Sequence, residues 1–346
     1  MSDVRLETNG IKYGGWKAIR IQRGIEQISG QFELSLTEKW AEQNTPRPIR
    51  PGAACRISID GETVITGHVD DVDPQYSSKS HSITAKGRDA TADLVDCSAP
   101  SFQWKGQTLL QGAEKLCRPF GIRVQAATDV GAAFTFKNNE GETVFETIER
   151  PARIRGLLLI SDGQGGLLIT RAGTKRAAGR LVLGKNIKEA KGHFSHRNRF
   201  SSYTIKGQSN GNAFSEAAQA YQVMAEVTDQ AIKRHRPMII VEDDPIDAAA
   251  AKTRTTWQRN VNAGRSQSVT YTVQGWRDQG GALWSPNWLI PVDDGYMGIS
   301  REMLITTVAL ILDDQGERAE LTVMLPEAFD LIELPEPKED EGGFGA

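Results

Sequence analysis

The chain has 346 residues, which is too long for one ordinary hydrophobic core and long enough for two to four small domains. Hydrophobic residues make up 39% and charged residues 25%, a balance typical of soluble globular proteins. The formal net charge of −3 argues against a protein that coats nucleic acid, because such proteins are normally strongly basic.

Residues 1–99 are predicted to be β-structure. Phe32, Leu34 and Leu36 alternate with polar residues, which is the pattern of a half-buried strand. Further on, Asp60-Gly61 stands between two strand-like runs and favours a two-residue hairpin, because both turn positions take positive φ. Several short strands separated by turns predict a small barrel or sandwich.

Residues 100–175 are predicted to be mixed α/β. An apolar stripe over residues 109–120 predicts a helix, with Thr108 and Gln111 as its capping box. The glycine-rich residues 162–165 then close a predicted hairpin between two apolar runs.

The second half of the chain begins with a strand pattern over residues 176–212. The alanine-rich residues 213–236 do not distinguish a helix from a loop. A helix is predicted to begin at Asp244 as its N-cap, with Pro245 in the first turn, and to end at Gly264.

Four strands are expected after this helix, over residues 268–276, 287–295, 302–314 and 317–326. The last two are joined by a predicted turn at residues 314–316. The residues from 331 to 346 are acidic and contain Pro and Gly, so we expect a flexible tail.

A short Thr-x-Lys/Gln-Gly pattern occurs three times and ends at Gly87, Gly207 and Gly275. Each glycine is expected where a strand ends. We call these three segments the echoes. The unequal spacings exclude a solenoid, whose period would be fixed. The first and third echoes continue into Arg88-Asp89 and Arg277-Asp278. They indicate either two related β modules or chance recurrence in a glycine-rich chain. Arg88-Asp89 is interpreted as an ion pair at a strand end rather than a catalytic pair.

The sequence presents no complete catalytic or metal-binding pattern. His193 and His196 have a spacing seen in metal sites, but no third ligand is nearby. Asp70, Asp71 and Asp73 resemble part of a calcium loop, whose glycine and closing glutamate are missing. There is no phosphate-binding loop and no nucleophile elbow. We therefore expect neither a metal nor a cofactor.

Four tryptophans lie close together in the sequence: Trp257, Trp276, Trp284 and Trp288. Most are expected in a core. Trp276 and Trp284, with Gly163 and Gly165 of the predicted hairpin, are the candidate interface residues, because Trp is enriched in protein interfaces.

The basic run from Lys185 to Arg199 fits a contact with nucleic acid or an acidic partner, but a hairpin face in water is favoured. Cys55, Cys97 and Cys117 form no disulfide pattern, which predicts buried thiols in a protein made in a reducing compartment. No apolar run approaches the roughly 20 residues of a membrane helix, so no membrane insertion is expected.

Several segments, in the order in which they occur, resemble the tail or baseplate hub proteins of Mu-like contractile-tailed phages. These segments are residues 23–40, 51–72, 81–99, 171–187, 199–208, 232–243 and 264–292. The resemblance covers residues 1 to about 330, and it depends on the ordered set rather than on one motif.

The resemblance implies a non-enzymatic homotrimer in which each subunit holds two related β-barrel modules. Three subunits then form a pseudo-sixfold ring between the tail tube protein and the central spike protein. Other baseplate proteins are further partners, and DNA passes through the channel only in transit. The implied location is the baseplate of the virion, after assembly in the host cytoplasm.

The expected fold class is mainly β with α+β insertions. The expected domains are a first β-barrel module (1–99), a mixed α/β domain (100–175), a second β-barrel module (176–212 with 265–330), a helix-containing insertion (213–264) and the tail (331–346). Two alternatives remain open: a tail-associated peptidoglycan hydrolase that uses an acidic pair, and a carbohydrate-binding module that uses exposed tryptophans.

Overall fold

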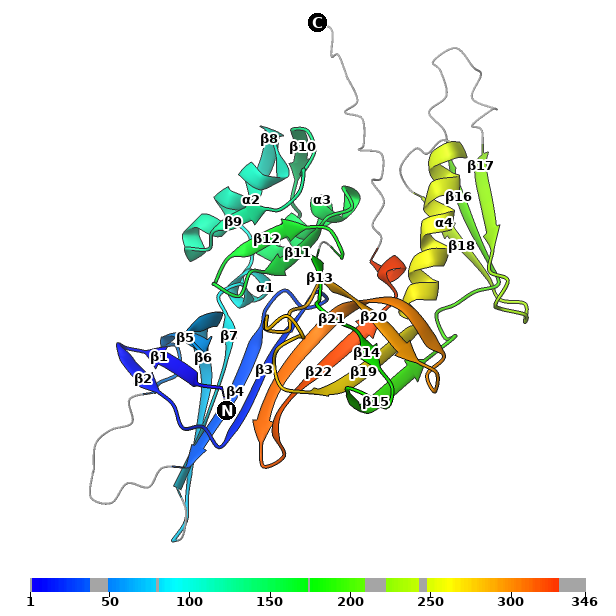
Figure 1. Ribbon diagram of the computed structural model, residues 1–346. Coiled ribbons are helices and arrows are strands. Elements are labelled where there is room, and N and C mark those ends of the chain that lie inside the picture. Colours follow the sequence, from blue (N-terminus) through cyan, green and yellow to red (C-terminus); the bar gives the residue numbers. More distant parts are fainter. Residues whose placement is uncertain are drawn as a thin grey trace, which may run out of the picture. The chain divides into compact units, whose positions relative to one another are not determined.

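The computed structural model describes residues 2–37, 49–78, 81–173, 175–208, 222–242 and 248–329. The chain divides into two compact units. Unit 1 comprises Met1–Ala152, Leu157–Gly192 and Ser268–Met324, and unit 2 comprises Arg153–Gly156, His193–Gln267 and Leu325–Ala346. Strands predominate over helices (Figure 1), which confirms the mainly β prediction.

Seven strands form the N-terminal strand group: β1 (Val4–Thr8), β2 (Ile11–Tyr13), β3 (Ala18–Gly24), β4 (Gln31–Thr37), β5 (Ala54–Ile59), β6 (Glu62–Tyr76) and β7 (His81–Asp89). They pair in the order β3-β4-β7-β6-β5-β1-β2. Phe32 and Leu34 are buried on β4, as their alternation predicts, and Leu36 is half-buried. Asp60 and Gly61 have φ of 50° and 86° between β5 and β6, which confirms the predicted hairpin.

Seven further strands form the C-terminal strand group: β13 (Lys175–Arg176), β14 (Leu181–Val182), β15 (Ile187–Phe194), β19 (Gln267–Gln274), β20 (Trp288–Asp294), β21 (Ile299–Asp313) and β22 (Gly316–Met324). The four strands predicted in this part of the sequence are therefore present. β21 and β22 are joined by the predicted turn, across which Asp313 pairs with Gly316.

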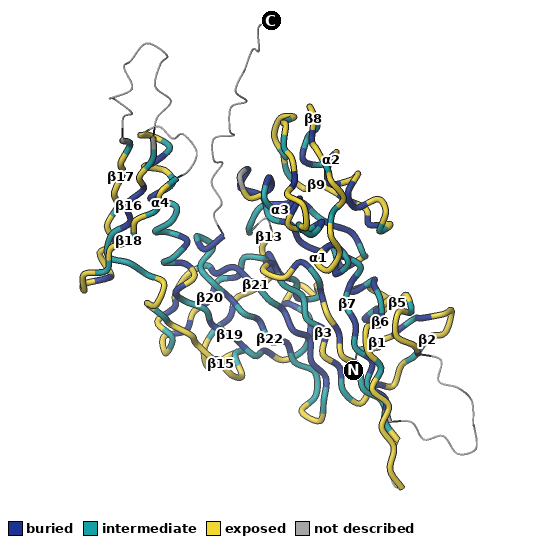
Figure 2. The backbone as a smooth tube through the Cα atoms, turned by 180° about the vertical axis from the view of Figure 1, so that it is seen from behind, coloured by how far each residue is buried: buried dark blue, intermediate teal, exposed yellow. Residues whose placement is uncertain are grey.

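One long strand, β21, joins the two groups into a single sheet. β22 lies along one of its edges, whereas the other edge pairs first with β20 and then with β3. Leu304 is opposite Leu289 of β20, and Leu310 is opposite Ile21 of β3. Most of β21 is buried (Figure 2), as a near-continuous apolar run predicts.

The mixed α/β part contains α1 (Ala92–Asp96), β8 (Gln103–Gln107), α2 (Leu109–Cys117), η1 (Arg118–Phe120), β9 (Val124–Ala126), β10 (Phe134–Lys137), α3 (Val144–Ile154), β11 (Leu158–Ser161) and β12 (Leu167–Thr170). The predicted capping box is confirmed: Gln111 N donates to Thr108 Oγ1 at 3.3 Å, and Thr108 N donates to Gln111 Oε1 at 3.0 Å. The predicted hairpin joins β11 and β12.

Unit 2 contains β16 (Ser202–Gln208), β17 (Gln222–Thr228), β18 (Pro237–Val241), α4 (Ala248–Arg265) and η2 (Pro326–Ala328). β16 is the central strand of a three-stranded sheet, and α4 covers one face through Ala251 and Ile205. α4 extends to Arg265, one residue past the predicted end. The predicted helix start at residues 244–245 and the tail lie outside the described residues.

The region 213–236, for which the sequence offered a helix or a loop, contains the strand β17 in its described part. Cys55 and Cys117 are buried free thiols, as predicted, but Cys97 is exposed. Cys97 directly follows the short helix α1, where the chain returns to the surface.

Candidate functional site

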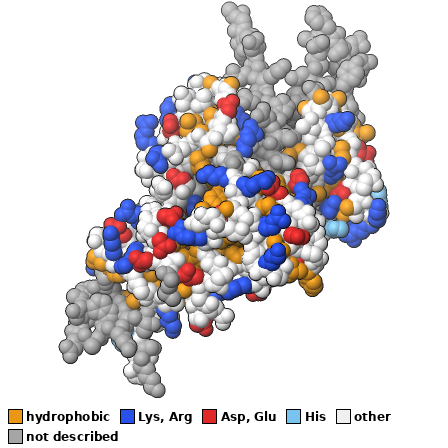
Figure 3. All heavy atoms as spheres, in the orientation of Figure 1, with side chains coloured by type: hydrophobic (Ala, Val, Ile, Leu, Met, Phe, Trp, Pro, Cys, Tyr) orange, Lys and Arg blue, Asp and Glu red, His pale blue; other side chains and the backbone are white. Residues whose placement is uncertain are grey.

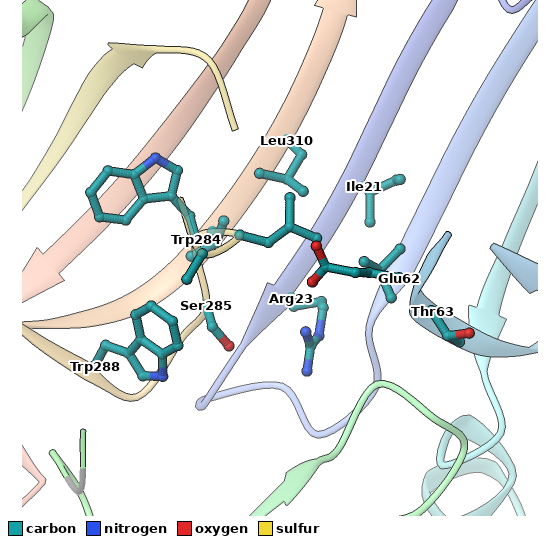
Figure 4. Close-up of a pocket in the computed structure, with 12 residues that line it drawn as sticks. Ile21, Arg23, Glu62, Thr63, Trp284, Ser285, Trp288 and Leu310 are labelled. Atoms are coloured by element: carbon teal, nitrogen blue, oxygen red, sulfur yellow. The ribbon is translucent and has the colours of Figure 1, made fainter. Parts of the chain in front are cut away.

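A pocket of about 250 Å³ lies within unit 1, where the two strand groups meet. Its apolar walls are formed by Ile21, Val64, Leu283, Trp284, Val308 and Leu310. In Figure 4, Trp284 and Trp288 stand on one side of this pocket and Thr63 on the other, with Arg23 and Glu62 between them. We call it the inter-group pocket.

Arg23 is the half-buried cation of the inter-group pocket. Among the residues that the structure describes, no carboxylate lies within ion-pair distance of its guanidinium. Loss of solvent lowers the pKa of Arg23, an effect that the more distant Asp89 and Asp162 oppose. Because buried charges are normally paired, this arginine has unused binding capacity.

Glu62 is the second charged residue of the pocket, and its charge is already balanced. Arg277 donates to Glu62 Oε1 at 2.7 Å and to Asp60 Oδ2 at 3.1 Å. The hydrogen bonds that it donates to these two carboxylates raise the pKa of Arg277. The β5–β6 turn of one strand group is thereby fixed to the segment that follows β19 of the other.

Asp278 organises the loop that carries Trp284. Its carboxylate accepts hydrogen bonds from the backbone N–H groups of Ala178, Gly280 and Ala282, at 2.8, 2.9 and 3.0 Å. Three backbone donors on one buried carboxylate make a rigid structural unit rather than a free general base.

Asp89 has the same role at the end of the first echo. It is 1% exposed and accepts from Gly30 N at 2.6 Å and from Thr91 N at 3.0 Å. Burial raises the pKa of Asp89, and these hydrogen bonds oppose that rise. Both echoes thus end in a buried carboxylate that holds backbone of a neighbouring loop.

The predicted ion pair within Arg88-Asp89 is wrong. Arg88 pairs instead with Asp70 and Asp96, at 2.7 and 2.8 Å, because successive residues of a strand point to opposite faces. Arg88 and Arg277 therefore have the same role in the first and third echoes, because each forms ion pairs with two carboxylates.

The three glycines of the echoes differ in their roles. Gly275 follows β19 with a φ of +74°, as predicted for a strand end. Gly87 lies inside β7, where a Cβ atom would come 2.2 Å from the carbonyl oxygen of His68. Gly207 lies inside β16. The prediction of a strand end is correct only for Gly275; at Gly87 the neighbouring strand requires the glycine.

The two candidate interface tryptophans lie in different surroundings. Trp276 is 2% exposed, and its Nε1 donates to the carbonyl oxygens of Ile311 and Arg318, both at 3.1 Å. It is a core residue of unit 1. Trp284 is 7% exposed and lines the inter-group pocket, and its buried Nε1 has no hydrogen-bond partner among the residues that the structure describes. An interface role for either residue stays a prediction.

The two candidate glycines pack beside the same pocket. Gly163 has a φ of +76°, and a Cβ atom there would come 2.8 Å from the carbonyl oxygen of Val64 and 2.9 Å from Arg23 Cζ. Gly165, with a φ of +86°, lies against Thr66. The structure thus brings Gly163 to Arg23. Sequence reasoning missed Arg23, because its unpaired state depends on contacts between distant segments.

The other sequence candidates form no site in the described ranges. No group of three His, Cys, Asp or Glu side chains there could hold a metal ion. Asp70 and Asp73 are ion-paired with Arg88 and Lys86. Arg199 of the basic run pairs with Asp229 at 2.6 Å. Charges of both signs are interspersed on the face shown in Figure 3. None of the described helices is long and apolar enough to span a bilayer.

Four protein families match parts of the chain that follow one another in the sequence, the last two with an overlap at residues 247–257. Residues 3–89 match the N-terminal part of the Mu phage baseplate assembly protein GpP-like family, and residues 91–171 match the second domain of the baseplate hub protein gp44-like family. Residues 199–257 match the third domain of the tail protein NMB1110-like family, and residues 247–332 match the fourth domain of Mu phage baseplate assembly protein GpP.

Whole proteins match over nearly the full length. The baseplate hub protein gp44 of Escherichia phage Mu is 34% identical over 98% of this chain and 92% of its own length. The crystal structure of the 43 kDa tail protein of prophage MuSo2 from Shewanella oneidensis is 42% identical, with a TM-score of 0.85 over 95% of this chain and 100% of that chain. The tail protein from Neisseria meningitidis MC58, at 24% identity over 96% of this chain and 99% of that chain, shares the fold with a TM-score of 0.81. The chain therefore belongs to the family of Mu-type phage baseplate hub proteins.

Proposed function

We propose that this chain is a non-enzymatic structural hub that works as a homotrimer in the baseplate of a contractile tail. Each subunit contributes two related β modules, built on the N-terminal and C-terminal strand groups, and each module approaches a small barrel. Three subunits then present six similar modules in a ring. Such a ring matches the sixfold tail tube on one side and the threefold central spike on the other, and it surrounds the path of the DNA.

The observation that carries this proposal is the pairing of β3 with β21, which couples the two strand groups into one sheet. The ends of β7 and β19 strengthen it. β7 ends in Arg88-Asp89, and Arg277-Asp278 follow β19. In both places the arginine pairs with two carboxylates, and the buried aspartate accepts hydrogen bonds from backbone N–H groups. Two similar building blocks rigidly joined in one chain are what a pseudo-sixfold ring of three chains requires.

The partners follow from the position of the hub. They are two further copies of the chain, the tail tube protein, the central spike protein and other baseplate proteins, with DNA present only in transit. The protein would be assembled in the host cytoplasm and then become part of the virion tail. The relative from phage Mu is itself named a baseplate hub protein.

Neither alternative is favoured by an observation. A hydrolase needs an accessible acidic pair, whereas the buried carboxylates Asp89 and Asp278 are occupied by backbone donors. A carbohydrate-binding module needs exposed tryptophans, but the six that the structure describes are buried or half-buried: Trp16, Trp104, Trp257, Trp276, Trp284 and Trp288.

The proposal is tested by mixing the purified chain with the tube protein and, separately, with the spike protein of the same tail, followed by sedimentation. We expect complexes with both partners and no soluble fragments from purified peptidoglycan. Release of fragments at a rate that scales with protein concentration, together with no binding to tube or spike, would contradict it.

A further inference from the structure

The inter-group pocket holds a cation that forms no ion pair with a described residue, although the charges of Asp89 and Asp162 act on it from a longer distance. Arg23 has no ion pair among the described residues. Glu62, the acidic residue of the same pocket, is bound to Arg277 at 2.7 Å. Asp89 binds the backbone N–H groups of Gly30 and Thr91. The pocket therefore offers a free guanidinium fork among apolar and aromatic walls.

The guanidinium and the apolar walls together indicate which kind of group the pocket binds. A guanidinium binds a carboxylate through two parallel hydrogen bonds, and the walls of Trp284, Val308 and Leu310 suit an aromatic or aliphatic group beside that carboxylate. The volume of about 250 Å³ lies below the roughly 300–1,000 Å³ of small-molecule sites. An anchoring side chain of a protein fits this pocket better than a metabolite does.

The chain itself displays the matching groups. Tyr296, in the turn between β20 and β21, is 85% exposed. The turn is fixed because Asp294 Oδ1 accepts hydrogen bonds from Tyr296 N at 3.0 Å and from Met297 N at 3.1 Å. Asp293 is exposed beside it and, like Arg23, has no ion pair among the described residues.

We propose that the inter-group pocket of one subunit binds the Asp293–Tyr296 tip of a second copy, with Asp293 paired to Arg23 and the Tyr296 ring against the tryptophans. Tip and pocket are different surfaces of one chain, so each copy uses its tip on one neighbour and its pocket on the other. Contacts of this kind generate closed rings when the rotation closes. The inference rests on the proposed homotrimer and assigns its subunit contact.

Two single substitutions test the contact on exposed residues that do not hold the fold. Tyr296→Ala and Asp293→Arg are each expected to raise the dissociation constant of the trimer by about tenfold or more, as loss of a buried anchor does. The matched control is Tyr76→Ala, which removes a tyrosine that is 79% exposed at the end of β6. This control leaves the trimer unchanged.

A charge exchange and a cross-link complete the test. Arg23→Glu combined with Asp293→Arg is expected to recover association relative to Asp293→Arg alone. Should Arg23→Glu fail to fold, a cross-link between Ser285→Cys and Tyr296→Cys, in a Cys97→Ser background, reports on the same contact. The variant with both cysteines should give covalent trimers under oxidation, whereas a variant with either cysteine alone should give no covalent trimer.

The outcomes separate the two proposals. A wild-type trimer that neither tip substitution weakens, and that the cysteine pair does not cross-link, overturns the assigned contact and leaves the hub intact. A wild-type monomer at every concentration contradicts the proposed homotrimer itself. A wild-type trimer that dissociates in the tip variants but not in Tyr76→Ala supports the contact.

Discussion

Arg277 and Asp60 form an ion pair of 3.1 Å between residues that are 217 positions apart in the sequence. Asp60 is the first residue of the β5–β6 turn, and Arg277 follows the end of β19. The pair therefore connects the N-terminal strand group to the C-terminal strand group at a second place, beside the backbone pairing of β3 with β21. Its contribution is measurable because both residues are partly exposed and can be replaced without opening a cavity.

Replacing Arg277 with Gln should lower the free energy of unfolding by about 0.5 kcal/mol, because exposed ion pairs contribute roughly 0.2–1 kcal/mol. A double-mutant cycle with Asp60→Asn, measured by urea unfolding, isolates the pairwise coupling. Arg5→Gln, which breaks the local pair with Asp3, is the control and should change stability less. A coupling energy of zero between Arg277 and Asp60 would show that the pair does not join the groups.

Gly87→Ala should be strongly destabilising, whereas Gly275→Ala should be mild. A Cβ atom at Gly87 would come 2.2 Å from the His68 carbonyl oxygen and 2.6 Å from the Phe32 ring. Overpacking against backbone costs about 3 kcal/mol. At Gly275 there is open space, and only the positive φ opposes alanine, at about 1 kcal/mol. The melting temperatures of the two variants test this prediction. An equal fall in melting temperature for Gly87→Ala and Gly275→Ala would contradict it.

Arg318 should make stability depend on pH through Asp313. The hydrogen bond from Arg318 lowers the pKa of Asp313 to about 2. Because the folded pKa lies below the ordinary value near 4, this contribution is complete above about pH 4 and is lost as the pH falls towards 2. The difference in unfolding free energy between wild type and Arg318→Gln should therefore shrink between about pH 4 and pH 2. Arg318→Lys is the control that retains the charge. A constant difference over this range would contradict the assignment.

Only Cys97 should react with a maleimide in the native protein at pH 8. Burial raises the pKa of Cys55 and of Cys117 to about 12, so almost no thiolate forms at either site. Mass spectrometry is expected to show one label before denaturation and three after it. Rapid labelling of Cys55 or Cys117 in the folded state would mean that these sites open to solvent.

The local features of this fold were predictable from the sequence because they depend on neighbouring residues. Alternation in β4, the Asp60-Gly61 turn and the capping box at Thr108 each follow from short-range chemistry. The family was also predictable, from an ordered set of segments. The ion-pair partners of Arg88 and the reason for Gly87 were not, because strands distant in the sequence determine them. The lack of an ion pair at Arg23 could not be predicted either, because it depends on residues that are distant in the sequence.

The mass of the purified chain in solution, determined by light scattering over a dilution series, decides whether the chain forms the proposed homotrimer. The mass of one chain is 37.9 kDa. The hub proposal predicts three times this mass, unchanged on dilution, because obligate interfaces usually bury more than about 2,000 Å². A single-subunit mass at all concentrations would contradict the homotrimer.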